Sequence, residues 1–328
     1  MHAISIRQGL IYALVIVAAL VAPYVLYPVF LMTLMCMALF ACAFNLLFGY
    51  TGLLSFGHAA FIGWAGYVTG FVLAHLGWPT FVGLLIGPAV AALIGFVMGF
   101  LAIRRQGLYF TMITLALAEM LYFVALRASF TGGEDGLQGV PRGDLFGVLN
   151  LHNDVTLYYV VLAITGGGLA LIWRTVHSPF GQVLKAIKEN EPRAISLGYD
   201  VDRYKLLAFV LSAALSGLAG STKTVIQGFV TLADVHWSMS GAVLLMTLVG
   251  GVGTMTGPIV GAVIIMWLDN RLSNIGNFLA SVTSIEWFKQ VGQSVTMVTG
   301  FIFIVCVLAF RGGIVGIIAA RLSRRAKP

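Results

Sequence analysis

The sequence predicts an all-α membrane protein, a bundle of about ten helical elements. Only 9% of its 328 residues are charged and 59% are hydrophobic, whereas soluble chains carry roughly 25% charged residues. Mean hydropathy is +0.97. The apolar runs are continuous rather than alternating, which favours helices over a membrane barrel. This composition excludes a soluble enzyme, a secreted disulfide scaffold and a disordered chain.

Each apolar run is a candidate membrane element. The first follows Arg7 and resembles a signal peptide, but it is long and has no convincing cleavage site, so we expect a retained span. The runs cover residues 9–27, 28–48, 53–76, 81–103, 108–126, 157–173, 206–230, 239–268 and 291–310.

Charges between the runs predict the orientation. Lys and Arg concentrate at Arg104–Arg105, in the loop 174–205 and in the tail 311–328, whereas the segment 128–155 is mainly acidic. The positive-inside rule places the basic regions in the cytoplasm and the acidic segment on the outer side of the membrane. We therefore expect both termini to be cytoplasmic. Basic residues at the ends of apolar runs serve orientation, so nucleic acid binding is not expected.

That orientation requires one more crossing than the nine runs supply. The run 239–268 is long for one span, and Gly250, Gly251, Gly253 and Pro258 interrupt it. Glycine and proline break helices, and broken helices at membrane depth lie within protein or beside water. We therefore predict two short, tilted or half-length helices here.

A similar glycine-containing interruption separates the second and third runs. Paired interruptions in the two halves of a transporter indicate its central pathway, although close helix packing through small residues is the alternative. The pathway interpretation assigns eight residues to a translocation path: Asn45, Thr51, Ser55, His58, Glu119, Gly250, Gly251 and Gly253.

Two ionisable residues of the apolar runs need separate treatment. Glu119 is in the middle of its run, so it either lines the path and contacts a solute ammonium group or bonds to a neighbouring helix. Lys223 lies near the outer end of its run and is expected to snorkel. No second ligand is at metal spacing from His58, so we expect a packing or capping histidine and no metal site.

The basic loop 174–205 has a helix-start signal at Ser178–Pro179 and apolar residues at helical spacing. A second short helix, 192–197, would expose Ala194, Ile195 and Leu197 and end at Gly198, with Asp202 capping the next membrane helix. The apolar stripe is suited either to the membrane interface or to a groove on a cytoplasmic partner.

Within this loop, residues 191–198 resemble the coupling loop of ABC importer permeases. Ala194 and Gly198 match that motif, Glu191 is displaced by one position, and Arg193 replaces an alanine. The wider chain resembles the branched-chain amino acid permeases, through NLLFGYTGLLSFGHAAF (45–61), GLYF (107–110), TLALAE (114–119), TGGEDG (131–136) and GGVGTMTGPIVGA (250–262).

This resemblance implies one permease domain, 1–328, in a multi-pass bacterial inner-membrane importer. It implies a second homologous permease, two cytoplasmic ATPase subunits and a periplasmic binding protein as partners. The chain has no phosphate-binding loop motif, so ATP hydrolysis is expected on other chains, with no catalysis and no cofactor here. The coupling contact is assigned to Glu191, Arg193, Ala194 and Gly198, and binding-protein docking to Glu134 and Asp135.

Three alternatives remain open. The same machine could carry other amino acids, amides, urea or aromatic acids. An ion-coupled carrier working alone would need paired ionisable groups at the membrane midplane. A membrane-embedded enzyme would need clustered carboxylates, histidines or metal ligands, and Glu119 is the only mid-membrane acid placed by the sequence.

Overall fold

The computed structural model describes residues 19–105, 107–145, 149–283, 300–301, 304 and 313–316. Most of the first and last predicted runs, most of the basic tail 311–328 and both chain ends therefore lie outside the described residues.

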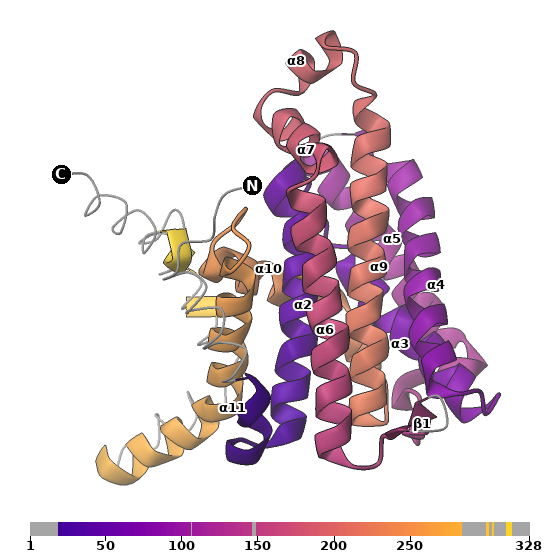
Figure 1. Ribbon diagram of the computed structural model, residues 1–328, viewed down its shortest axis with the longest axis vertical. Helices are drawn as coiled ribbons and strands as arrows, with labels where there is room; N and C mark the ends of the chain where they lie inside the picture. The colour runs from indigo at the N-terminus through magenta and orange to yellow at the C-terminus, as the bar shows by residue number, and fades with distance from the viewer. Residues whose placement is uncertain are drawn as a thin grey trace.

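The described part of the chain is overwhelmingly helical (Figure 1). Residues 19–25 are helical. The helices that follow are α2 (Pro28–Thr51), α3 (His58–Ala74), α4 (Thr80–Ala102), α5 (Leu108–Arg127), α6 (Asp154–Val176), α7 (Pro179–Glu189), α8 (Glu191–Ser196), α9 (Val201–Gln227), α10 (Trp237–Gly250) and α11 (Gly257–Thr283). Short 3-10 turns are η1 (Ser129–Thr131), η2 (Gly133–Asp135) and η3 (Leu232–Asp234), and β1 (Asp144–Leu145) pairs with β2 (Leu149–Asn150) in an antiparallel hairpin.

Five described helices are long and apolar enough to cross a membrane: α2, α4, α5, α6 and α9. The shorter α3 and α10 are also apolar. A 14-residue helix such as α10 spans about 21 Å, less than the roughly 30 Å hydrocarbon core of a bilayer. The structure thus confirms an all-α polytopic membrane protein with half-length elements.

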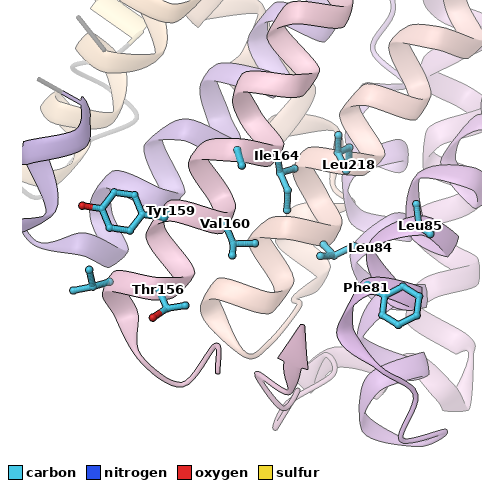
Figure 2. A pocket seen from close by; sticks show the side chains of 10 residues that line it. Phe81, Leu84, Leu85, Thr156, Tyr159, Val160, Ile164 and Leu218 are labelled. Atoms are coloured by element: carbon cyan, nitrogen blue, oxygen red, sulfur yellow. The ribbon is translucent and has the colours of Figure 1, made fainter. Parts of the chain in front are cut away.

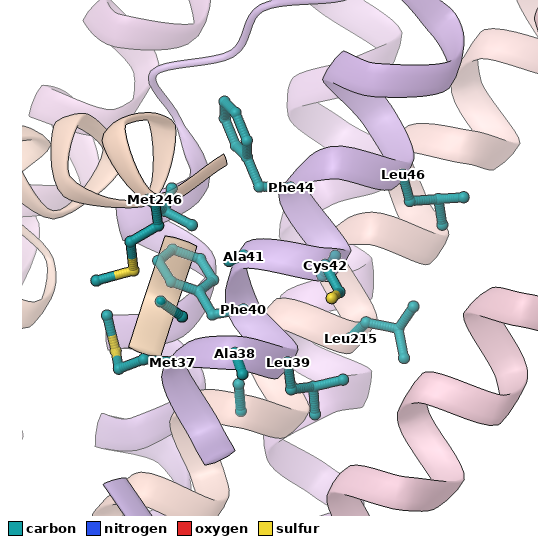
Figure 3. Close-up of a cluster of buried hydrophobic side chains, with 14 of the residues drawn as sticks. Met37, Ala38, Leu39, Phe40, Ala41, Cys42, Phe44, Leu46, Leu215 and Met246 are labelled. Atoms are coloured by element: carbon teal, nitrogen blue, oxygen red, sulfur yellow. The ribbon is translucent and has the colours of Figure 1, made fainter. Parts of the chain in front are cut away.

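Helices α2 and α9 form the centre of the bundle. In the most apolar stretch of each helix, 72% of the residues of α2 and 67% of those of α9 are buried, compared with 28% for α4 and 22% for α5. Helix α2 is apolar around its whole circumference and packs against α6, α9, α10 and α11, as expected of a helix enclosed by protein. Figure 3 shows Leu215 of α9 and Met246 of α10 beside the α2 side chains.

Close packing of α9 on α3 and α4 depends on glycine. A Cβ added to Gly220 would lie 2.1 Å from the Ile62 carbonyl oxygen, and one on Gly217 would lie 2.4 Å from the Ala91 Cβ. Small residues let helix backbones approach closely where lipid supplies no hydrophobic driving force.

The bundle has two chemically different ends (Figure 1). Helices α7 and α8 project from one, which we call the basic end. The hairpin β1–β2 lies at the other, which we call the acidic end, and Gly143 beside β1 lies against Thr80 at the start of α4. The basic loop and the acidic segment therefore lie on opposite sides, as the charge pattern predicts.

The run 239–268 is interrupted as predicted. Helix α10 ends at Gly250, α11 begins at Gly257, and the two helices pack against each other. Only α10 is short, however: α11 has 27 residues and continues past Leu268. A helix can continue past polar residues such as Asp269 and Asn270, because its backbone hydrogen bonds do not require apolar side chains. The length of the apolar run therefore underestimates the length of α11.

Candidate functional site

The first break consists of the non-helical residues between α2 and α3. Helix α2 stops at Gly52, whose φ of +79° suits glycine. Thr111 of α5 donates to the Leu54 carbonyl at 2.9 Å. The Ser240 hydroxyl of α10 donates to the Phe56 carbonyl at 2.7 Å and accepts from the Ala59 N–H at 2.8 Å. Side chains from two other helices thus form hydrogen bonds with backbone N–H and C=O groups that have no partner within a helix at the break.

Asn45 joins the C-terminal part of α2, which leads into the first break, to the second break between α10 and α11. Its amide nitrogen donates to the Thr254 carbonyl at 2.8 Å, and its amide oxygen accepts from the Gly253 N–H at 2.9 Å. A Cβ on Gly49 would lie 2.2 Å from the Asn45 oxygen and 2.8 Å from the Gly253 nitrogen. We call this contact the break clamp, defined by Asn45, Gly49, Gly253 and Thr254. It brings together two segments that are far apart in the sequence.

The other residues assigned to the path are held inside the protein. The Thr51 hydroxyl donates to the Leu47 carbonyl at 2.6 Å, and Ser55 accepts from the Gly57 N–H at 3.1 Å. The Nε2 of His58 lies 2.9 Å from the Ser212 hydroxyl, and its ring is fully buried. These contacts also fit the packing alternative.

The glycines that end α10 also fit the packing alternative. A Cβ on Gly250 would meet the Gly257 carbonyl oxygen at 1.8 Å, so this position brings α10 and α11 into contact. Gly251 follows at the C-cap with a φ of +129°.

Glu119 has different surroundings. It lies near the middle of α5 and lines a cavity of about 270 Å³ together with Phe56, Leu115 and Trp237. Its Oε1 atom is buried and has no hydrogen-bond partner within the described part of the chain. The structure thus brings Glu119 beside the first break and the start of α10.

The basic loop folds closely to expectation. The Ser178 hydroxyl caps α7, Asn190 caps α8, and Gly198 has a φ of +87°. Asp200, rather than Asp202, caps α9, because its carboxylate reaches the Arg203 N–H at 3.3 Å. Asp202 lies in the first turn.

Helix α8 exposes fewer apolar residues than expected. Ala194 is 2% exposed and packs with Ile187 and Val201, whereas Ile195 and Leu197 are 57% and 68% exposed. Ala194 faces inward because a single helical turn resting on α7 and α9 must bury one side. Arg193 is exposed, and Glu191 forms a 2.7 Å ion pair with the buried Lys205 of α9.

Sequence reasoning missed a contact between this loop and the break clamp. Lys188 of α7 donates to the Gly49 carbonyl at 2.7 Å, and the Lys185 ammonium lies 5.7 Å from the centre of the Tyr50 ring. The helical period puts both lysines on the polar face of α7, but nothing in the sequence identifies a partner on α2.

At the acidic end, Glu134 and Asp135 are exposed. Leu137 pairs with Val230 through two backbone hydrogen bonds of 2.9 Å, which attach this segment to the chain after α9. Lys223 does not snorkel: it forms an ion pair with Asp234 of η3, with side chains only 12% and 11% exposed. The partner lies beyond the apolar run, so run boundaries alone did not reveal it.

A large apolar groove opens between α4 and α6. Its volume is about 960 Å³, and Leu218 of α9 lies between the two walls (Figure 2). Phe81, Leu84 and Leu85 come from α4, and residues of α6 form the other wall. In a membrane protein such a lining suits contact with hydrocarbon.

These features define a class: a multi-pass helical membrane protein with discontinuous helices, which is typical of transport proteins. The family model described as "Branched-chain amino acid transport system / permease component" matches residues 26–308, and the chain belongs to this family.

Named relatives share part of their length with this chain. It is 29% identical over 245 residues to the high-affinity branched-chain amino acid transport system permease protein LivM of Escherichia coli (strain K12), which covers 68% of this chain and 58% of that protein. It is 29% identical over 210 residues to the ribose import permease protein RbsC of Bacillus subtilis (strain 168), covering 58% and 62%. The matches thus span less than two thirds of either relative.

Among solved structures, a chain of PsaBC from Streptococcus pneumoniae in complex with Fab aligns with a TM-score of 0.41 and 17% identity, covering 89% of this chain and 95% of that chain. A score of this size does not establish a shared fold.

Proposed function

We propose that this chain is a permease subunit of an ATP-driven importer for branched-chain amino acids in a bacterial inner membrane. In this proposal it pairs with a second homologous permease, two cytoplasmic ATPase subunits and a periplasmic binding protein, and it binds no cofactor itself. Family membership and the similarity to LivM support the transport role and the solute.

The observation that carries the proposal is the exposed tip of α8. Ile195 and Leu197 project at the basic end, on a turn anchored by Ala194 and by the Glu191–Lys205 ion pair. A short apolar helix held rigidly in water is suited to a groove on a partner. We assign that groove to the ATPase subunits, with Glu191 and Ala194 fixing α8 and with Arg193 and Gly198 at its surface.

The contacts beneath α8 suggest how ATP hydrolysis would reach the membrane. Lys188 of α7 binds the Gly49 carbonyl, and the break clamp carries that contact to Gly253. A displacement of the α7–α8 pair would therefore act on the end of α2 that leads into the first break and, through the break clamp, on the second break. Broken helices are elements that can rearrange around a transported solute.

The proposed path runs beside the two breaks. Seven residues shape and support it: Asn45, Thr51, Ser55, His58, Gly250, Gly251 and Gly253. Glu119 lines a cavity next to it. Glu134 and Asp135 would dock the binding protein, because they are exposed at the end opposite α8.

Reconstituted vesicles containing the complete importer test this function. We expect leucine uptake that requires ATP and the ATPase subunits. Uptake driven by an ion gradient alone would favour the secondary-carrier alternative. Uptake of another solute but not leucine would favour a different cargo, an alternative that the similarity to the ribose permease keeps open.

Two substitutions test the coupling route. Gly198→Arg should abolish ATPase stimulation by the loaded binding protein. A Cβ there meets no atom within 4 Å, and the strain of arginine at a φ of +87° falls on the exposed turn after α8 rather than on the bundle. Lys188→Met should raise the ATP hydrolysed per leucine imported, whereas Lys188→Arg keeps the donor and should raise it less. Normal stimulation and an unchanged ratio would contradict the route.

A further inference from the structure

The ion pair between Lys223 and Asp234 lies buried at the acidic end of the bundle. Lys223 is close to the end of α9, Asp234 is in η3, and their side chains are only 12% and 11% exposed. Removing two charges from water is costly, and apolar side chains of similar size often stabilise a fold as well. Stability alone therefore does not account for a pair of charges at this position.

A third polar group lies next to the pair. The hydroxyl group of Tyr67, on α3, is buried and has no hydrogen-bond partner within the part of the chain that the structure describes. Tyr67 packs in the same hydrophobic cluster as Val230 and Val235, which flank η3, and it lies close enough to Asp234 to interact with the charge of that carboxylate. A buried hydroxyl without a partner is unfavourable, so a ligand that supplied the missing hydrogen bond would gain affinity here.

These three groups match the two charges of a free amino acid. The solute carboxylate would accept from the Lys223 ammonium and the Tyr67 hydroxyl, and the solute ammonium would donate to the Asp234 carboxylate. Each charge of the protein pair would then keep an opposite charge beside it, with hydrogen bonds between charged groups. The valine side chains that flank η3 are suited to an apolar side chain on the solute.

The same exchange excludes solutes that carry one charge or none. An amine would bind Asp234 and leave Lys223 without a partner, and a carboxylate would do the reverse. A sugar would separate the pair without replacing either charge. Because breaking a buried ion pair is strongly unfavourable unless both partners are replaced, the pair selects zwitterions over amines, acids and sugars.

The pair lies between the acidic segment and the first break. Leu137 of the acidic segment pairs with Val230, shortly before η3. Asp234 is followed closely by α10, whose Ser240 hydroxyl donates to the Phe56 carbonyl of the first break. Separation of Lys223 from Asp234 would release η3 from α9, and η3 leads directly into α10. A solute bound at the pair would therefore act on the first break.

We propose that Lys223, Asp234 and Tyr67 form an outer gate, which a zwitterionic solute opens by exchanging the internal ion pair for ion pairs with its own two charges. This inference rests on the proposed function. It adds a recognition step within the permease, between the binding protein and the breaks.

Thermal unfolding of the full-length purified chain tests the recognition step. The probes, at equal concentrations, are leucine, 3-methylbutylamine (leucine without its carboxylate), 4-methylpentanoate (leucine without its ammonium group) and ribose. We expect leucine to raise the unfolding midpoint by at least about 2 °C, because a ligand that binds only the folded state stabilises it. The other three should leave the midpoint unchanged. No shift with leucine, or an equal shift with either singly charged analogue, would overturn the gate.

A double variant separates recognition from a purely structural role. Lys223→Met/Asp234→Leu replaces the pair by apolar side chains, so the chain should fold. Leucine should no longer raise its unfolding midpoint, and uptake by the complete importer should fall at least about tenfold, because the hydrogen bonds to both solute charges are lost. The matched control is Arg142→Gln/Asp154→Asn, which removes a more exposed ion pair at the same end and should leave both properties unchanged. Normal uptake by the folded Met/Leu variant would show that the pair is only structural.

The Tyr67→Phe variant keeps the test decisive if the double variant fails to fold. It removes only a hydroxyl group that has no partner among the described residues, so the stability of the unliganded chain should not fall. Leucine binding should weaken about fivefold, the effect of one lost hydrogen bond. Unchanged leucine affinity in this variant would contradict the site.

The two proposals fail separately. If the complete importer carries leucine normally with Lys223→Met/Asp234→Leu, the gate is wrong and the proposed function stands. If leucine stabilises the wild-type chain through the pair but the importer does not carry leucine, the proposed function is wrong and the site stands.

Discussion

At the scale of single residues, the polar groups inside this bundle form specific contacts. Asn45 uses both ends of its amide, Lys205 and Glu191 join α9 to α8, and Lys223 meets Asp234. Because unpaired polar groups are costly in hydrocarbon, each pair fixes how two segments meet.

We expect Lys223→Met to destabilise the protein by about 3–5 kcal/mol, because Asp234 would be left buried without its cation. The double variant Lys223→Met/Asp234→Leu should recover much of this loss. Thermal unfolding in detergent measures both effects. A single variant as stable as the wild type would show that the pair contributes nothing.

Asn45→Ala should lower the free energy of unfolding by about 2 kcal/mol, since it leaves the Gly253 N–H and the Thr254 carbonyl without their partner. It should also uncouple ATP hydrolysis from uptake if the break clamp transmits movement. Thr33→Ala is a suitable control, because the Thr33 hydroxyl bonds only within its own helix, to Val29. Equal stability of the two variants would argue against the clamp.

At the scale of helices, packing decides where glycine is required. Gly220 of α9 lies against the backbone of α3, whereas a Cβ on Gly166 of α6 meets nothing within 4 Å. The same residue type thus has different roles at two helical positions, and only the neighbouring helix distinguishes them.

Gly220→Ala should therefore destabilise the bundle by about 1–3 kcal/mol through overpacking. Gly166→Ala should be neutral or stabilising by up to about 1 kcal/mol, because alanine favours a helix. Chemical or thermal unfolding of the two variants compares them directly. If Gly166→Ala lowered the stability more than Gly220→Ala did, the observed packing of α9 would be refuted.

At the scale of the whole molecule, the charge asymmetry and the fold agree. The α7–α8 pair and the acidic segment lie at opposite ends of the bundle (Figure 1), so a membrane around the apolar helices would separate them. The positive-inside rule assigns the α7–α8 end to the cytoplasm.

Single cysteines test that orientation. Leu197→Cys should react with a membrane-impermeant maleimide only in inverted vesicles, and Asp135→Cys only in intact cells, since both side chains are exposed at opposite ends. The native Cys36 and Cys42 are buried and should stay silent, and the third native cysteine, Cys306, is replaced by serine in the parent protein. Labelling of both positions from one side would show that the assigned topology is wrong.

The sequence by itself determined the membrane class, the opposite placement of the basic and acidic loops, the two breaks, the N-cap of α7 and the glycine that follows α8. Those features depend on local composition and on residues a few positions apart. Only the tertiary structure decided that Asn45 of α2 binds the second break, that Lys188 reaches Gly49, that Lys223 pairs with Asp234 and that Ala194 faces inward. These contacts depend on which helices pack side by side. Hydropathy does not encode that choice, because nearly every face of the membrane helices is apolar.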